Sequence, residues 1–284
     1  MSQQKFQGFI CATATPFGII GSVDHEALRR HMAFMQEKGA GGILANGTTG
    51  EFYSLTREER RAVFTTIRES FSGTVISHVG GMPPAEAADE ARWSADHGAD
   101  GILCLLPSYP SGLPAKGIAA ALGEVQSATE LPFLIYNFPI HTGNDLTPEI
   151  LRDVEHVAVK DSSANLDLIA AAKGYLVGGD RSIEESWKRG GHGFVSAGSS
   201  ALPEYYAEIA RAIREGDGER VERMQLLIAR QQEVMGGPLT TPKIKYALSK
   251  RLPGYPEYVR APQAPLPVSE RNAVDGYLGD RSLG

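Results

Sequence analysis

The chain has 284 residues, of which 42% are hydrophobic and 22% charged, and its net charge at pH 7 is −6. This length suits one large globular domain or two smaller ones. The mildly acidic balance offers no basic surface for nucleic acid or anionic membrane, so we expect small-molecule partners instead. The two cysteines, Cys11 and Cys104, and the polar N-terminus MSQQKFQG predict a cytoplasmic protein without a disulfide framework or a signal peptide.

Short apolar runs, typical of strands buried on both faces, recur along the chain. Eight of them are found, at Gly8–Thr13, Gly42–Ala45, Thr74–Val79, Gly101–Leu105, Pro132–Asn137, Val157–Lys160, Tyr175–Gly178 and Gly193–Ser196. Three follow a polar helix end and a glycine-rich turn, as in EKGAGGILANG (37–47), DHGADGILCLLP (96–107) and KRGGHGFVSAG (188–198). This weak repeat is spaced in multiples of about 30 residues, the size of a strand-plus-helix unit.

Helical patterns lie between most of these runs. Asp24–Lys38 has an apolar face, Thr56–Ser70 opens with the capping-box pattern TREE, and Pro84–His97 begins with proline. Alternating strands and helices, followed by further helical sequence, predict an α/β fold, a (β/α)8 TIM barrel rather than an open doubly wound sheet. We expect a single domain, with the barrel core at about residues 1–203 and a C-terminal helical extension with an extended, proline-rich tail at about 204–284.

Polar residues follow several of the predicted strands, at the end where TIM barrels carry their active sites. NGTTGE (46–51) follows the second run, Tyr136 lies near the end of the fifth, and Lys160 ends the sixth. A lysine in a partly apolar pocket loses solvation, which favours its neutral, nucleophilic amine. With tyrosine and threonine hydroxyls to transfer protons, such an amine can form an imine with a carbonyl substrate.

Each of these residues also has a purely structural interpretation. Lys160 is compatible with solvation or with an ion pair to Asp161. Tyr136 is compatible with core packing, and Thr48 and Thr49 with the shaping of a glycine-flanked turn. The seven histidines show no metal-ligand spacing, so we expect no metal site.

Taken together, the motifs resemble the pyruvate-dependent class I aldolase family of dihydrodipicolinate synthase and N-acetylneuraminate lyase. They occur in the family's order and spacing: ATPF (14–17), NGTTGE (46–51), YNFP (136–139), VKDSS (159–163), GGD (178–180) and GFVSAGSSALPE (193–204). The resemblance covers essentially the whole chain. It implies a (β/α)8 barrel with additional C-terminal helices and a lyase activity that proceeds through a lysine Schiff base.

The resemblance also implies roles for individual residues. Lys160 corresponds to the Schiff-base lysine and Tyr136 to the acid/base tyrosine. Thr48 and Thr49 correspond to the threonines that bind the pyruvate carboxylate, and Thr49 also to the proton-relay position. Tyr109 corresponds to the tyrosine that family members lend to a neighbouring subunit, which implies a homo-oligomer, a dimer or a tetramer.

Further substrate contacts are implied at Gly47, His141, Gly178, Asp180 and Val195. The protonated imine on Lys160 would serve as the electron sink for cleavage or formation of the C3–C4 bond. We therefore expect no metal and no organic cofactor.

One position departs from the synthase pattern. Dihydrodipicolinate synthases typically place an arginine two residues after the proline of the YNFP motif, where this chain has His141. Histidine cannot make the bidentate pair with a carboxylate that arginine makes. Together with the segments PIHTG and VKDSS, this favours the 2-keto-3-deoxy sugar acid aldolase branch. We expect reversible cleavage of a 2-keto-3-deoxy acid into pyruvate and an aldehyde.

The sequence leaves other functions open. Within the family, these are dihydrodipicolinate synthase, which joins pyruvate to aspartate semialdehyde, and a keto-deoxy sugar acid dehydratase or deaminase. Outside the family, they are a non-catalytic barrel that senses a keto acid and a barrel isomerase that uses GFVSAGSS (193–200) as a phosphate loop. The joint presence of Lys160, Tyr136 and Thr49 disfavours both, because neither needs an imine-forming amine with a proton relay.

Overall fold

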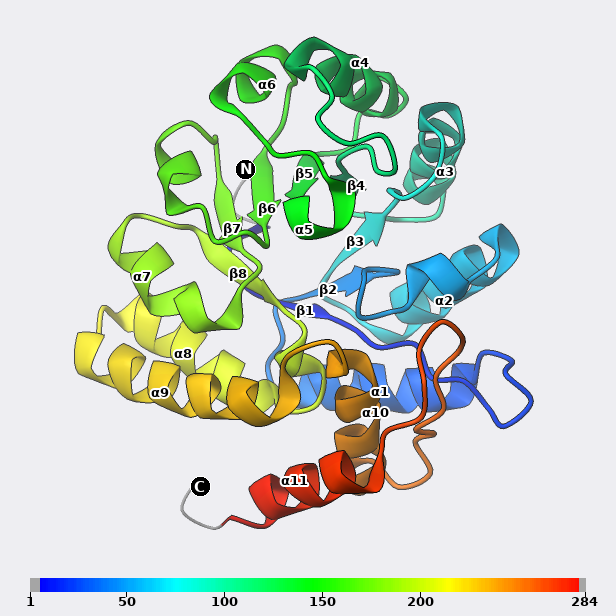
Figure 1. The fold of residues 1–284 in the computed structure, drawn as a ribbon, viewed down its shortest axis with the longest axis vertical. Helices are drawn as coiled ribbons and strands as arrows, with labels where there is room; N and C mark the ends of the chain where they lie inside the picture. The colour runs from blue at the N-terminus through cyan, green and yellow to red at the C-terminus, as the bar shows by residue number, and fades with distance from the viewer. Residues whose placement is uncertain (1–5, 281–284) are drawn as a thin grey trace. The chain divides into compact units, whose positions relative to one another are not determined.

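The computed structural model describes residues 6–280, and its strands form a closed barrel in the chain order β1 to β8 (Figure 1). The strands are β1 Gly8–Ala12, β2 Gly42–Ala45, β3 Thr74–His78, β4 Gly101–Leu105, β5 Phe133–Asn137, β6 Ala158–Asp161, β7 Tyr175–Val177 and β8 Gly193–Ser196. Each strand end lies within one residue of the predicted end, since short apolar runs bounded by turn residues pack well as buried strands. The predicted TIM barrel is confirmed.

Helices alternate with most strands and continue after the barrel. They are α1 His25–Glu37, α2 Arg57–Ser70, α3 Pro84–Asp96, α4 Ala115–Gln126, α5 Pro139–Thr142, α6 Pro148–Asp153, α7 Ile183–Lys188, α8 Pro203–Glu215, α9 Gly218–Met235, α10 Thr240–Arg251 and α11 Val268–Gly279. The predicted capping box is present at the start of α2. The Thr56 hydroxyl accepts a hydrogen bond from the N–H of Glu59 at 3.2 Å, and the Glu59 carboxylate accepts one from the N–H of Thr56 at 3.0 Å.

The described residues divide into two compact units. Within the described residues, the first unit is drawn from 6–10 and 74–195, and the second from 11–73 and 196–280. Each unit combines segments that are distant in sequence. The predicted motifs are therefore shared between them, with YNFP and VKDSS in the first unit and NGTTGE in the second.

The parallel register of the first unit determines which of its side chains share a face. Strands β3 to β8 pair in order, and Tyr136 of β5 is the Cα partner of Lys160 of β6. The following pair is Asn137 and Asp161. Because side chains alternate along a strand, Tyr136 and Lys160 share one face of the sheet, and Asn137 and Asp161 share the other.

The core of the second unit comes largely from helices. Buried apolar side chains of α1, α9, α10, α11 and the segments near them form one cluster: Ala14, Ala27, Ala201, Leu202, Met235, Ile244, Tyr246, Ala247, Leu248, Tyr255, Leu266, Val274 and Tyr277. The proline-rich segment between α10 and α11 has no helix, as predicted. It is more than a surface tail, however, because Tyr255, Val259 and Leu266 within it are buried.

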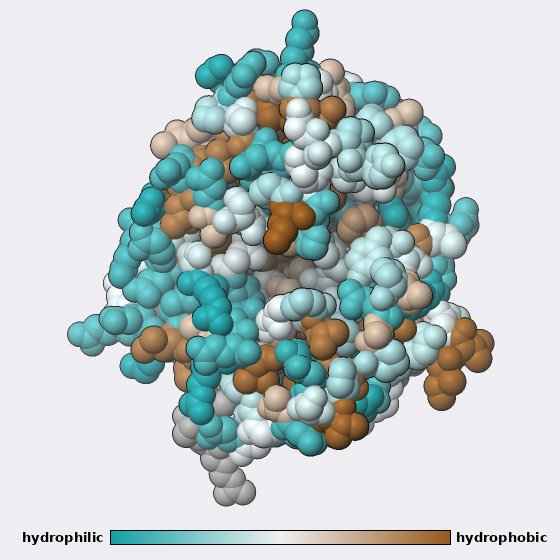
Figure 2. Space-filling view, in the orientation of Figure 1, coloured by the Kyte–Doolittle hydropathy of each residue, from teal (hydrophilic) through white to brown (hydrophobic). Residues whose placement is uncertain are grey.

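The cysteines, the helices and the surface bear on several expectations from the sequence. Both cysteines are free and buried, as expected of small core residues. Between residues 6 and 280, no helix has the length and hydropathy needed to cross a membrane, and no group of three or more His, Cys, Asp or Glu side chains is arranged to hold a metal ion. The face shown in Figure 2 is largely hydrophilic, with separate hydrophobic patches.

A completely buried histidine on α1 belongs to the second unit. His31 Nε2 lies 2.9 Å from the carbonyl oxygen of Ser200, and Nδ1 lies 3.3 Å from the hydroxyl oxygen of Thr13. Because a carbonyl only accepts hydrogen bonds, the network places the proton of the neutral ring on Nε2. Burial lowers the pKa of His31 to about 4, and the hydrogen bond to Ser200 offsets only part of this effect.

This histidine should make the fold sensitive to mild acid. In the unfolded chain, His31 becomes protonated as the pH falls below 6.5. In the folded chain, it stays neutral until the pH reaches about 4. The stability contribution of neutral His31 is thus complete above pH 6.5 and is lost as the pH falls. Between pH 6.5 and 5.0 we expect a loss of about 1.5 kcal/mol from this site.

Urea unfolding at the two pH values measures this loss. His31→Gln should reduce the difference between them, whatever its absolute stability, whereas His97→Gln at an exposed position should leave the difference unchanged. Equal pH dependence in wild type and His31→Gln would show that the buried imidazole has no such effect.

Candidate active site

The structure brings Lys160 and Tyr136 together on adjacent strands of the first unit. Lys160 Nζ lies 3.6 Å from the centre of the Tyr136 ring, the geometry of a close cation–π or amine–aromatic contact. Both side chains are buried, with 5% of Lys160 and 1% of Tyr136 exposed. Among the described residues, Lys160 forms no ion pair. The amine is therefore enclosed and is not engaged by an acid.

The neighbouring carboxylate, Asp161, is engaged elsewhere. It is completely buried, and its oxygens accept five hydrogen bonds of 2.6–3.1 Å, from Asn137 Nδ2, the N–H and hydroxyl of Ser163, the N–H of Asn165 and the hydroxyl of Tyr175. A buried carboxylate is tolerated when donors satisfy it in this way. The alternative that Lys160 is paired with Asp161 is wrong, because the two side chains point to opposite faces of β6.

The Asp161 network joins three consecutive strands. Asn137 lies on β5, Asp161 on β6 and Tyr175 on β7, and Asn137 also donates to Asp145 at 2.8 Å and accepts from the N–H of Leu146 at 3.0 Å. Burial, and then the hydrogen bond to Asp161, raise the pKa of Tyr175, which keeps its hydroxyl a donor. The Asp161 network was not predicted from the sequence. The sequence feature that could have indicated it is the polar residue directly after each of Tyr136 and Lys160, namely Asn137 and Asp161.

Aromatic contacts hold the ring of Tyr136. His78 meets it edge-on, with ring centres 6.1 Å apart, and Phe138 stacks on it at 5.7 Å. Tyr136 is therefore packed, as its structural interpretation proposed. Packing and acid/base chemistry are compatible here, because a fixed ring keeps its hydroxyl in a defined position.

Two other predicted residues of the first unit are exposed. His141 lies on α5, with its ring edge-on to Phe138 at 4.2 Å. Tyr109 lies in the loop between β4 and α4, is fully exposed and has a backbone φ of 80°. The left-handed region is strained for a bulky residue and persists where the surrounding chain imposes it. A pocket of about 490 Å³ lies between the loops at 80–84 and 104–110 and includes Tyr109 in its lining.

The remaining predicted contacts of the first unit follow β7 or lie on β8. The N–H of Gly178 donates to the carbonyl oxygen of Asp161 at 2.6 Å. A Cβ at this position would lie 2.3 Å from the hydroxyl oxygen of Ser162 and 3.1 Å from the carbonyl oxygen of Asp161, so an added side chain would require the Ser162 side chain to move. Asp180 is buried at the start of the short 3-10 helix η4 (Asp180–Ser182), and Val195 is buried on β8.

Gly47, Thr48 and Thr49 belong to the second unit, where they form a compact turn. The N–H of Gly50 donates to the carbonyl oxygen of Gly47 at 3.0 Å, and the N–H of Glu51 to that of Thr48 at 3.1 Å. Thr49 is buried and Thr48 is partly exposed. Their action on a substrate held by Lys160 stays a prediction.

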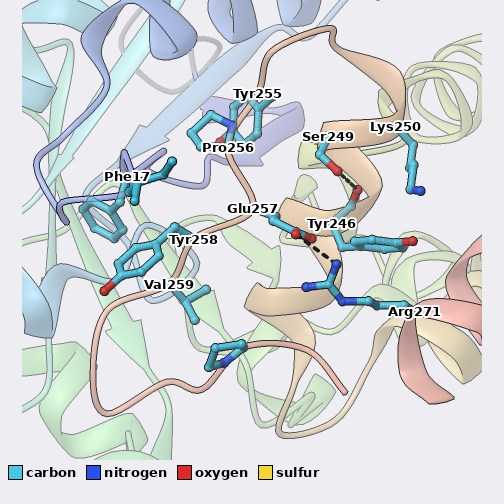
Figure 3. Close-up of a pocket in the computed structure, with 12 residues that line it drawn as sticks. Phe17, Tyr246, Ser249, Lys250, Tyr255, Pro256, Glu257, Tyr258, Val259 and Arg271 are labelled. Carbon is cyan, nitrogen blue, oxygen red and sulfur yellow. Dashed lines mark hydrogen bonds and ion pairs between the residues drawn. The ribbon is translucent and has the colours of Figure 1, made fainter. Parts of the chain in front are cut away.

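The second unit has its own pocket, of about 670 Å³, near α10 (Figure 3). Phe17 and Tyr258 lie at one side of it and Tyr246 at the other. Two of its charged groups are paired with each other, since Arg271 lies 2.9 Å from Glu257 Oε1. No constellation of nucleophile and base is visible among the residues that line it, so the catalytic candidates are those of the first unit and the NGTTGE turn.

Comparisons with known proteins agree with this geometry. The model of the dihydrodipicolinate synthetase family matches residues 5–280. The chain is 31% identical to a 4-hydroxy-tetrahydrodipicolinate synthase of Nitratidesulfovibrio vulgaris, with 96% of this chain and 98% of the relative covered. It is 30% identical to a protein of the same name from Methanosarcina mazei, with 79% of this chain and 81% of the relative covered.

Solved structures agree as well. Dihydrodipicolinate synthase from Aquifex aeolicus superimposes with a TM-score of 0.91 at 27% identity, covering 98% of this chain and 99% of that one. The enzyme from Acinetobacter baumannii, in a complex with pyruvate, superimposes with a TM-score of 0.89 at 26% identity, covering 98% of this chain and 99% of that one. The chain belongs to the dihydrodipicolinate synthetase family, whose members are class I lyases that act through a lysine Schiff base.

Proposed function

We propose that the protein is a pyruvate-dependent lyase in which Lys160 forms the imine and Tyr136 transfers protons. The observation that carries this proposal is the enclosed amine of Lys160, 3.6 Å from the Tyr136 ring centre and without an acid partner among the described residues. An unpaired amine can attack a keto carbon. A neighbouring phenol can donate a proton to the developing hydroxyl and help it leave as water.

The protonated imine then makes cleavage or formation of the C3–C4 bond possible, because it accepts the electron pair of that bond. Tyr136, left as a phenolate after it has given up its proton, takes the proton of the C4 hydroxyl group. The C3–C4 bond then breaks, the imine accepts its electron pair as an enamine, and the C4 fragment departs as an aldehyde. Protonation of C3 and hydrolysis release pyruvate and restore the amine. The reverse sequence condenses pyruvate with an aldehyde. The mechanism needs no metal or organic cofactor, because the imine itself is the electron sink.

Other predicted residues have supporting roles in this proposal. Thr48 and Thr49 would bind the pyruvate carboxylate through hydroxyl and N–H groups, with Gly47 leaving the backbone accessible, and Thr49 would relay protons. Gly178, Asp180 and Val195 would contact the substrate at the ends of β7 and β8. The phosphate-loop alternative receives no support from the serines of GFVSAGSS. Ser196, Ser199 and Ser200 are completely buried and are bonded to the chain itself, for example Ser199 to Ser196 at 2.9 Å.

Two candidates for the second substrate, the one that reacts with pyruvate, are each supported by a specific observation. The name shared by the relatives favours 4-hydroxy-tetrahydrodipicolinate synthesis, in which the second substrate is aspartate semialdehyde. Arg181 is exposed beside Asp180 and forms no ion pair among the described residues, so it can provide the carboxylate contact that His141 cannot. We take this as the first candidate. The second is a hydroxylated, uncharged aldehyde from a 2-keto-3-deoxy acid, favoured by His141 itself.

The central prediction is a covalent adduct on one lysine. Pyruvate with borohydride should add a reduced three-carbon group at Lys160, and Lys160→Ala should abolish both adduct and turnover. Tyr136→Phe should still fold and should slow turnover by about 10²–10⁴-fold, the usual loss for a general acid/base. Peptide mass mapping and steady-state rates measure these results. Lys245, which has no exposed surface, is an internal control, and an adduct there would remove Lys160 from the mechanism.

A second prediction concerns Tyr109, whose exposure suits a role in a neighbouring subunit's site. Tyr109→Phe and Lys160→Ala should each be nearly inactive alone. When the two variants are mixed and reassembled, half of the dimers contain one subunit of each kind. In such a hybrid, one site has both Lys160 and Tyr109 and the other has neither. About a quarter of wild-type activity should therefore return. Sedimentation and activity of the mixture test this. No recovery in a mixture that forms hybrid dimers would place Tyr109 in its own subunit's site or outside the mechanism.

A third prediction separates the two second substrates. On the first candidate, kcat/KM should be higher with aspartate semialdehyde than with glyceraldehyde. Arg181→Gln should lower only the semialdehyde value, by about ten- to a hundredfold, as expected for a charged hydrogen bond worth about 1.5–3 kcal/mol. Arg189→Gln, a surface arginine already paired with Glu185, is the matched control. A wild-type preference for glyceraldehyde, with semialdehyde activity gained in His141→Arg, would favour the second candidate.

A further inference from the structure

A buried ion pair lies at the end of the NGTTGE turn. Glu51, the last residue of the motif, pairs through Oε1 with the ammonium group of Lys245 on α10, and neither side chain has exposed surface. Lys245 also donates to the carbonyl oxygen of Tyr258 at 2.9 Å and lies 4.1 Å from the centre of the Phe17 ring. The N–H of Arg260 donates to Glu51 Oε2 at 3.2 Å. Segments distant in sequence thus converge on one carboxylate.

Burial works against both charges of this pair. It lowers the pKa of Lys245 to about 8, and it raises the pKa of Glu51, while the nearness of each charge to the other acts in the opposite sense. Removing two charges from water costs so much that well-packed apolar residues often stabilise a core equally well. Stability alone therefore does not account for a lysine and a glutamate at these positions.

The pair acts on a turn whose two ends have left-handed backbone, which is unfavourable for Glu51. Asn46 and Glu51, which flank it, have left-handed backbone φ angles of 57° and 55°. Residues other than glycine keep this conformation where surrounding contacts impose it. Asn46 is held by a hydrogen bond from its Nδ2 to the carbonyl oxygen of Arg60, at 2.9 Å. Glu51 is held by Lys245 and by the Arg260 N–H, and Thr48 and Thr49 lie between these two attachments.

We propose that Lys245 is a positioning residue, which holds the NGTTGE turn through Glu51 so that Thr48 and Thr49 are ready to bind the carboxylate of pyruvate. The proposal rests on the proposed function, in which these threonines are the carboxylate site. Donors that are already in place bind an anion more tightly, because binding does not have to order them. Lys245 does not touch the substrate, since Glu51, Tyr258 and Phe17 enclose its ammonium group.

A double substitution separates positioning from stability. Lys245→Met alone leaves a buried carboxylate unpaired, so it should lower stability and pyruvate binding together. Glu51→Gln combined with Lys245→Met removes both charges and should recover most of the lost stability, but not the attachment of the turn. The pyruvate concentration for half-maximal borohydride trapping at Lys160 should therefore rise about tenfold or more in the double variant. The adduct yield at saturating pyruvate should match wild type.

A neighbouring ion pair provides the matched control. Lys243 lies on the same helix and pairs with Glu270 of α11 at 2.8 Å instead of with Glu51, so Lys243→Met with Glu270→Gln should leave half-maximal trapping unchanged. A double variant of Glu51 and Lys245 that traps pyruvate at the wild-type concentration, or that does not fold, overturns the proposal. Failure of the proposed function has a different signature, because wild type itself would then form no adduct at Lys160.

Discussion

The buried carboxylate of Asp161 is the constraint on which the candidate site of the first unit depends. A carboxylate without solvent needs donors, and Asp161 obtains them from β5, β7 and the chain after β6. Asn137 and Tyr175, which flank Asp161 on β5 and β7, reach it on one face of the sheet. Side chains alternate along a strand, so the same arrangement directs Lys160 to the opposite side, toward Tyr136. The amine is left without an acid because the adjacent acid is fully occupied.

A second buried carboxylate has a comparable place in the second unit. Glu51 ends the NGTTGE turn as Asp161 ends β6, and each is satisfied by groups that do not belong to the predicted catalytic set. The two acids differ in how they are satisfied. Asp161 accepts hydrogen bonds from uncharged donors, whereas Glu51 is paired with a buried ammonium group. The ion pair of Glu51 costs more desolvation free energy than the hydrogen bonds of Asp161, and it connects the turn to α10 in the C-terminal extension.

Family membership and substrate choice depend on different parts of the molecule. Family membership rests on residues 5–280, which the family model matches, and the proposed function assigns the Schiff-base chemistry to the buried lysine and the tyrosine beside it. In the proposed function, the second substrate would be selected by other side chains, among which His141 and Arg181 are exposed. A few substitutions at such positions can change the accepted aldehyde without changing the imine chemistry.

The sequence by itself determined the order and the bounds of the barrel strands. Glycine-bounded apolar runs and local capping patterns such as TREE depend on neighbours in the chain, so they can be read without a tertiary structure. It also identified Lys160 and Tyr136 as candidates, because both stand at strand ends in recognisable motifs. Only the tertiary structure decided that Asp161 accepts hydrogen bonds from Tyr175 and Asn137 and does not pair with Lys160. It also decided that Lys245 forms an ion pair with Glu51. These pairings join residues 14 to 194 positions apart in the chain. Burial and hydrogen bonding between such residues are set by packing, which leaves no pattern in either segment alone.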